Sequence, residues 1–146
     1  MADVLNEIIK LHRAYVWSYD SATGMANLFP RDRNILSWRV TDVDFKDKTL
    51  REIFISDDLL SLRQHGIAFF RGRGNLGWLD DTKVSLKAQN TQARLLLNQL
   101  CSQLPFAALW HVELHEPGWQ GATATLMFKG FAVKPRSPEQ SQDDAK

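Results

Sequence analysis

The sequence has a single cysteine, Cys101, and therefore cannot form a disulfide within one chain. Small secreted domains usually depend on disulfides, whereas proteins of a reducing compartment do not. The first ten residues mix polar and charged side chains among the apolar ones, unlike a signal peptide. No stretch approaches the roughly 18 apolar residues that span a bilayer. We therefore expect a cytoplasmic protein that has no contact with the membrane.

An excess of one sign of charge is lacking as well. The 18 basic and 17 acidic side chains leave a formal net charge of +1. A general electrostatic attraction to nucleic acid or to an anionic membrane needs a clear basic excess. The composition excludes a broadly basic binding protein and leaves open a local basic patch.

The length of 146 residues is that of one domain, and five Trp with eight Phe can fill a core. We predict a single domain over residues 1–134. Residues 135–146 are polar, interrupted by proline and free of aromatic side chains. Such a segment buries too little apolar surface to offset the entropy of ordering, so we expect a disordered tail.

Apolar spacing predicts two main helices. Val4, Ile8 and Leu11 share one face of a helix over about 4–14. A second apolar stripe predicts one long helix over about 81–103, and consists of Leu86, Ala93, Leu97, Leu100 and Leu104. The solvent face of that helix would hold Lys83, Lys87, Asn90, Arg94 and Asn98.

Short apolar or alternating runs predict strands. They lie at 16–19, 25–29, 35–45, 67–70, 106–116 and 121–133, and Ser56 marks a further helix start. Turn residues between successive runs favour antiparallel hairpins. The predicted fold class is α+β, a mostly antiparallel sheet packed by the long helix (about 81–103) and the N-terminal helix.

A glycine-rich segment at 72–77 matches the G-x-G-x-x-G spacing of dinucleotide-binding loops. In that motif the glycines lead directly into a helix, whereas here residues 78–82 intervene with their own helix-start signal, so we expect no cofactor. Arg71 and Arg73 beside Trp78 suggest phosphate or nucleic-acid binding instead, because they combine positive charge with an aromatic face. An ordinary strand-to-helix loop explains the same residues.

Alternate positions of a predicted strand carry His111, Glu113 and His115. Side chains at such positions point to one face, and imidazole with carboxylate is a zinc- or iron-type ligand set. Polar residues opposite a buried face give the same pattern without a metal. Both interpretations stay open.

The segment that ends in Asp44-Phe-Lys46, with Asp32 before it, resembles the restriction-endonuclease-like nucleases. That resemblance implies carboxylates that hold Mg²⁺ and a lysine near the attacking water. It would make Asp32, Asp44 and Lys46 the catalytic residues of a Mg²⁺-dependent nuclease. A strand that runs into a charged turn accounts for the same sequence.

Trp78 and Trp119 are candidate anchors for a partner protein, because Trp buries a large area at low entropy cost; both could instead fold over the core. The last strand could accept a strand from another subunit if it lies at a sheet edge, or be a paired central strand. Cys101 lies near an apolar stripe, as a buried thiol does.

The favoured function is therefore a non-catalytic protein–protein interaction or assembly module that binds itself or another protein and needs no cofactor. The order of elements loosely resembles phage tail-completion proteins, which would make it a self-associating subunit of a larger complex. The Mg²⁺-dependent nuclease and the phosphate or nucleic-acid binder are the alternatives.

Overall fold

The computed structural model describes residues 2–33, 35–55, 64–69, 81–115 and 124–131. The elements in these residues follow the order α1 (Ala2–Leu11), β1 (Tyr15–Asp20), β2 (Met25–Pro30), β3 (Arg39–Thr49), α2 (Leu50–Ile55), β4 (Ile67–Phe69), β5 (Lys83–Gln92), α5 (Ala93–Ser102), β6 (Ala107–Leu114) and β7 (Ala124–Phe131). None of these helices has the length and apolar character that crossing a membrane requires.

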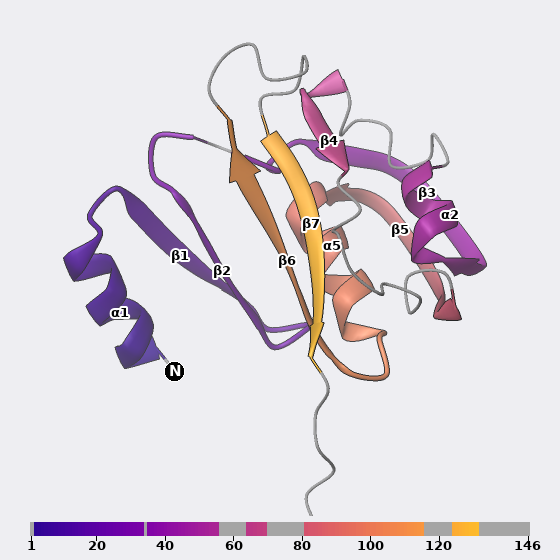
Figure 1. Ribbon diagram of the computed structural model, residues 1–146, viewed down its shortest axis with the longest axis horizontal. Coiled ribbons are helices and arrows are strands. Elements are labelled where there is room, and N and C mark those ends of the chain that lie inside the picture. The colour runs from indigo at the N-terminus through magenta and orange to yellow at the C-terminus, as the bar shows by residue number, and fades with distance from the viewer. Residues whose placement is uncertain (1, 34, 56–63, 70–80, 116–123, 132–146) are drawn as a thin grey trace, which may run out of the picture.

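The strands form three small sheets (Figure 1). β1 and β2 make an antiparallel hairpin, and β3 pairs antiparallel with β5. In the third sheet β7 lies between β6, to which it is antiparallel, and the short β4, to which it is parallel. The α+β class with mostly antiparallel pairing is confirmed, and β7 is the central strand rather than an edge.

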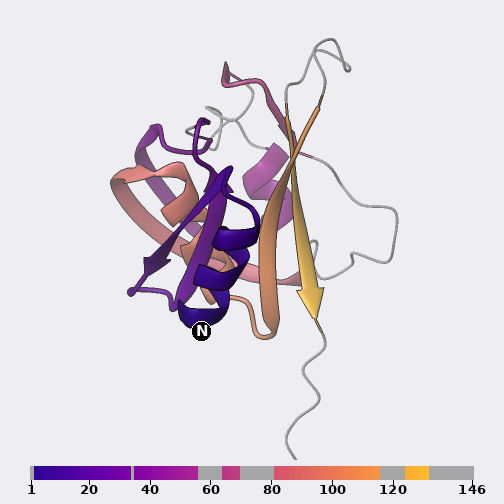
Figure 2. The same cartoon turned by 90° about the vertical axis from the view of Figure 1, so that its left-hand side faces the viewer.

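The N-terminal helix and the hairpin form one unit at one side of the molecule (Figures 1 and 2). Trp17 on β1 donates a hydrogen bond from Nε1 to Asn6 Oδ1 on α1, at 3.0 Å. The hairpin turn is closed by Asp20, whose carboxylate accepts hydrogen bonds from Ala22 N and Thr23 Oγ1. α1 contacts β1 and has no buried residue, so it lies away from α5 instead of beside it.

The helix expected over 81–103 needs a correction, because its first half is strand β5 and only its second half is helix α5. Leu86 and Ala93 are seven residues apart, which suits one helix face. Over residues 83–89, however, the buried or half-buried Val84, Leu86 and Ala88 alternate with exposed side chains, which is the period of a strand. Pairing with β3 therefore extends the chain up to Gln92.

Helix α5 starts without a side-chain cap. Its first amides are instead bound by the backbone of the segment before β3. Ala93 N donates to Trp38 O at 3.0 Å, and Arg94 N donates to Leu36 O at 3.1 Å. These bonds satisfy donors that a helix otherwise leaves free, and they fix where α5 begins relative to β3.

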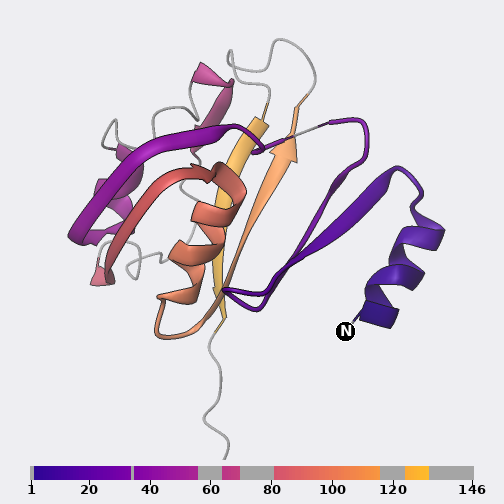
Figure 3. The same ribbon diagram turned by 180° about the vertical axis from the view of Figure 1, so that it is seen from behind.

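Helix α5 is the centre of the core (Figure 3). Leu96, Leu97 and Leu100 are at most 1% exposed and pack between the β3–β5 pair and the β6–β7 pair. The other buried apolar residues come mainly from β3, α2, β4, β5 and β7, and include Val40, Val43, Phe45, Leu50, Ile53, Ile67, Val84, Leu126 and Phe128. Strand β6 packs half-buried side chains against them: Ala108, Trp110 and Val112. The core thus lies on one side of the hairpin, not beneath it.

Helix α2 begins at Leu50 and ends at Ile55. The helix start expected at Ser56 lies outside the described residues and stays a prediction. Thr49 and Glu52 form a reciprocal cap: Thr49 N donates to Glu52 Oε2, and Glu52 N donates to Thr49 Oγ1. The hydrogen bonds from Thr49 hold the pKa of Glu52 below its ordinary value. Thr49 and Glu52 have the spacing of a helix cap in the sequence, but Thr49 is also the last residue of a strand.

Asn98 is fully buried on α5, although helical spacing placed it on a solvent face. Its Nδ2 donates to Asp20 Oδ2 at 3.0 Å, and its Oδ1 accepts from Trp110 Nε1 at 2.8 Å. One side chain therefore connects the hairpin turn, helix α5 and strand β6. A buried amide is tolerated because both of its ends are satisfied.

Replacing Asn98 with Ala should destabilise the fold by about 2–3 kcal/mol, since it leaves Trp110 Nε1 buried without an acceptor and opens a small cavity. Urea unfolding would measure the change in the free energy of unfolding. Ser102→Ala, at the exposed end of the same helix, should change it by less than about 0.5 kcal/mol. Equal effects of the two substitutions would contradict this role for Asn98.

Candidate functional site

A cavity of about 630 Å³ lies between β2 and β6, and we call it the β2–β6 cleft. It has the size of an ordinary ligand site. The described residues that line it are Tyr15, Met25, Ala26, Asn27, Leu28, Phe29, Pro30, Ile35, Leu36, Arg94, Leu109, Trp110, His111, Val112 and Leu114. The hairpin forms one wall, β6 the other, and Arg94 of α5 lies between them.

Both walls of the β2–β6 cleft are edge strands. Among the described strands, β2 pairs only with β1 and β6 only with β7. All six residues of β2 line the cleft, as do four consecutive residues of β6, 109–112. Side chains alternate between the two faces of a strand, so a consecutive run indicates that strand edges, and not one face, border the space. Unpaired backbone groups therefore face the cleft from both sides.

Two side chains of the cleft carry buried hydrogen-bond donors without a partner in the structure. Asn27 is 6% exposed and its Nδ2 is unpaired, and Nη1 of Arg94 is buried and unpaired as well. The remainder of the Arg94 side chain is held in place: Nε donates to Gln92 Oε1 at 3.2 Å, and the guanidinium lies 4.6 Å from the ring centroid of Phe29. The site is apolar with two fixed donors.

His111 is the other titratable nitrogen base of the lining. Burial lowers its pKa, Lys129 across the sheet lowers it further, and Glu113 opposes them only in part. The imidazole is therefore mainly neutral at neutral pH. Because the described lining contains no Asp or Glu, Arg94 supplies the one fixed charge of the cleft.

The buried bonds of Asn98 position one wall of the cleft, because Trp110 lines it and Asp20 ends β1. Partial burial by itself raises the pKa of Asp20. Hydrogen bonds from Thr23, Asn98 and Ala22 outweigh that effect and hold the pKa below its ordinary value. The charged form of Asp20 is thus the one that holds the hairpin turn against α5.

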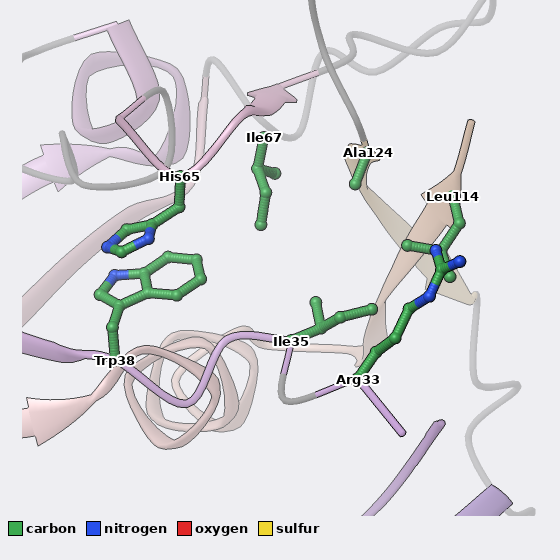
Figure 4. A pocket seen from close by; sticks show the side chains of 7 residues that line it. All are labelled: Arg33, Ile35, Trp38, His65, Ile67, Leu114 and Ala124. Atoms are coloured by element: carbon green, nitrogen blue, oxygen red, sulfur yellow. The ribbon is translucent and has the colours of Figure 1, made fainter. Parts of the chain in front are cut away.

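A second, smaller cavity of about 270 Å³ adjoins the cleft and shares Ile35 and Leu114 with it. Its most ordered feature is a stack of the Trp38 and His65 rings, with centroids 4.0 Å apart and planes 19° from parallel (Figure 4). Arg33 is exposed at its opposite side. The shared residues make this cavity a side space of the cleft.

The three residues of the metal hypothesis do not come together as a ligand set. His111 faces the cleft, whereas His115 places Nε2 2.5 Å from Thr125 Oγ1. Glu113 is exposed on β6, opposite Thr125 in register. No group of three or more His, Cys, Asp or Glu side chains able to hold a metal occurs within the part of the chain that the structure describes.

The nuclease hypothesis places its residues on two separate elements. Asp44 and Lys46 are exposed on β3, and the Asp44 carboxylate lies 3.3 Å from Lys87 Nζ on β5. Asp32 is exposed beyond the end of β2. Asp44 is thus engaged in a surface ion pair, and within the described residues it belongs to no group of three or more metal-ligating side chains.

Arg71, Arg73, Trp78 and Trp119 lie outside the described residues, so their binding roles stay predictions. Cys101 is 4% exposed, which confirms the buried thiol expected from its position. Burial raises the pKa of this thiol to about 12. It is therefore protonated at neutral pH and unsuited to nucleophilic chemistry.

No pattern in the sequence indicates the two donors of the cleft. Arg94 was expected on a solvent face of the long helix, and Asn27 was an ordinary member of a short strand. Their burial depends on the hairpin packing against the start of α5, two segments far apart in the chain. Local sequence patterns do not indicate that two such distant segments pack together.

Comparison with known proteins identified no relative of this chain. No family model, curated protein or solved structure matches the chain. The resemblances to restriction-endonuclease-like nucleases and to phage tail-completion proteins gain no support from it. The function is therefore inferred from the β2–β6 cleft and the surfaces around it.

The lowered pKa of Asp20 predicts a loss of stability in acid. A carboxylate whose pKa is lowered by folding stabilises the native state above the unfolded-state pKa, and this contribution is lost as the pH falls. From about pH 7 to about pH 3, across the ordinary value of 3.8, the free energy of unfolding should fall less in Asp20→Asn than in the unsubstituted protein. Urea unfolding at a series of pH values would measure this.

Asn98→Ala provides a second variant for the same series, because it removes one of the hydrogen bonds to the Asp20 carboxylate. Its pH dependence should lie between those of Asp20→Asn and the unsubstituted protein. Parallel curves for all three proteins would show that Asp20 does not link the fold to pH.

Proposed function

We propose that this protein is a non-catalytic protein–protein interaction module that takes an extended segment of a partner protein into the β2–β6 cleft. The observation that supports it is the pair of unpaired strand edges that border one cavity. A strand inserted there would pair with β2 on one side and β6 on the other, and would join the hairpin to the β6–β7–β4 sheet. Strand addition is an established mode of peptide recognition.

The lining of the cleft favours binding over catalysis. Most of the described lining residues are apolar, and none is a Ser, Thr, Cys, Asp, Glu or Lys. His111, whose pKa is lowered by burial, is not paired with an Asp, Glu, Ser, Thr, Cys or Lys of the described lining. General acid–base or covalent catalysis needs such a pair within hydrogen-bond reach. A site of apolar walls with two fixed donors suits recognition.

Strand insertion can be tested with a displayed library of random peptides of about nine residues, a strand-like length. The protein should enrich peptides in which apolar residues alternate. In a strand between two edges, successive backbone N–H groups bond to opposite neighbours. N-methylation at either of two successive interior positions should therefore weaken binding about tenfold. Isothermal titration calorimetry would give the affinities.

A matched pair of hairpin variants serves as the control. Leu28 and Tyr19 are both exposed, but only Leu28 lines the cleft. Leu28→Arg should abolish peptide binding and Tyr19→Arg should retain it. A library that yields no binder, or binders equally well bound by Leu28→Arg, would refute the proposal. If N-methylation weakened binding only at every second position, the peptide would pair with one strand edge, β2 or β6, and not with both.

A second proposal, self-association, is favoured by the surface of the N-terminal unit. Five of the seven large hydrophobic side chains that are exposed in the described residues belong to this unit: Val4, Leu11, Tyr15, Tyr19 and Leu28. Val4 is 63% exposed and Leu11 80%, and their spacing puts them on one face of α1. A helix that is amphipathic but buries no residue is suited to packing against a partner.

The charge pattern of α1 favours a second copy of this chain as that partner. Asp3 lies in the first turn of the helix and Lys10 in its last turn, where Lys10 also pairs with Glu7 of the same helix. Two α1 helices packed antiparallel would place the acidic first turn of each beside the basic last turn of the other. Such a two-fold interface is the commonest arrangement of soluble oligomers. The α1 residues of this interface, Val4 and Leu11, do not line the β2–β6 cleft.

Self-association predicts a mass of two chains in solution at micromolar concentration, measured by sedimentation equilibrium. The double substitution Val4→Gln and Leu11→Gln should give the mass of one chain, because it removes the apolar contact and keeps the helix. Leu114→Gln changes an equally large hydrophobic residue outside the N-terminal unit and should leave the dimer intact. A monomeric unsubstituted protein would refute this interface.

A further inference from the structure

The β2–β6 cleft holds a half-buried positive charge, that of Arg94, which no carboxylate of the described residues neutralises. Arg94 makes no ion pair with the described residues, and Nη1 of its guanidinium is buried without an acceptor. Burying a charged group without a partner is costly, so such groups are usually paired or bind a ligand. Its contact with the Phe29 ring and its bond to Gln92 hold the guanidinium in place but use neither Nη1 nor a counter-charge.

The second unpaired group is a donor as well. The Asn27 residue is 6% exposed, and its Nδ2 has no hydrogen-bond acceptor in the structure. Strand β2 and helix α5 bring this amide and the guanidinium to one cavity. A ligand that satisfies both must offer acceptors, and negative charge would also neutralise Arg94. A carboxylate meets both conditions, because its two oxygens only accept and it binds guanidinium groups strongly.

The surroundings leave that position to a ligand. The nearest carboxylate of the hairpin, Asp20, is already bound by Thr23 and Asn98 and does not line the cleft. The neutral His111 adds no competing charge. The rest of the described lining is mainly apolar, so a charge-assisted bond there is little weakened by water.

We infer that the segment bound in the β2–β6 cleft carries an acidic side chain that points inward between two apolar ones, and that Arg94 and Asn27 bind its carboxylate. This inference rests on the proposed function. Side chains of an extended segment point inward at every second position. The recognised pattern is therefore apolar–x–acid–x–apolar, with the acid over Arg94 and the apolar residues against the walls of the cleft.

Two blocked peptides test the inference: acetyl-Val-Thr-Val-Thr-Glu-Thr-Val-Thr-Val-amide and the same peptide with Gln in place of Glu. The blocked ends make the Glu side chain the sole carboxylate of the pair. Isothermal titration calorimetry with the full-length protein should show at least tenfold tighter binding of the Glu peptide, which corresponds to about 1.4 kcal/mol. The Asn27 side-chain amide resonances should shift only with the Glu peptide.

Substitutions of Arg94 and Asn27 test which of the two side chains binds the carboxylate. Arg94→Met should bind both peptides with the affinity that the unsubstituted protein shows for the Gln peptide. Asn27→Asp keeps the shape but repels a carboxylate, so it should weaken the Glu peptide more than the Gln peptide. Arg51→Met, at an exposed position of α2 outside the cleft, should keep the preference. Urea unfolding would verify that each variant is folded.

The outcomes separate this inference from the function on which it rests. Equal affinities for the two peptides would overturn the carboxylate preference and leave strand insertion standing. Failure of both peptides to bind would overturn both. A Glu preference that persists in Arg94→Met and in Asn27→Asp would remove these two residues from recognition and overturn the inference.

Discussion

The hydrogen bonds of the buried Asn98 amide are the constraint on which the rest of the structure depends. The hairpin contributes little to the apolar core, so its position rests on few contacts. Asn98 binds Asp20 at the hairpin turn and Trp110 on β6, and so holds two unconnected sheets against one helix. Because these bonds act between side chains and not between strand edges, β2 and β6 are brought close without being paired.

The cleft therefore combines satisfied and unsatisfied polar groups within a small region. The amide of Asn98 has a partner at each end, whereas the donors of Asn27 and Arg94 have none. Polar groups that only supported the fold would all be expected to be satisfied. Asn98 therefore supports the fold, and the unpaired donors of Asn27 and Arg94 are the basis of the proposal that the cleft binds a ligand.

Much of the architecture was predictable from the sequence, because hairpin turns and alternating strands are local signals. The hairpin at 16–29 and the strands of the last sheet lie close to where their patterns placed them. The division of residues 81–103 into a strand and a helix was not predictable, because the spacing of Leu86 and Ala93 fits either structure. The cleft itself was not predictable either: Asn27 and Arg94 become buried only when the hairpin meets α5. Chain-distant packing of this kind leaves no periodic trace in the residues.

The central position of β7 has a consequence for how the chain folds. It is the last of the described strands, yet it pairs with both β4 and β6. During synthesis the ribosome must release nearly all of the other elements before this sheet can close. The contact between β4 and β7 also spans a long stretch of sequence, and contacts of that kind slow folding. The unpaired edges of β4 and β6 in the nascent chain should therefore need protection by chaperones until β7 has been synthesised.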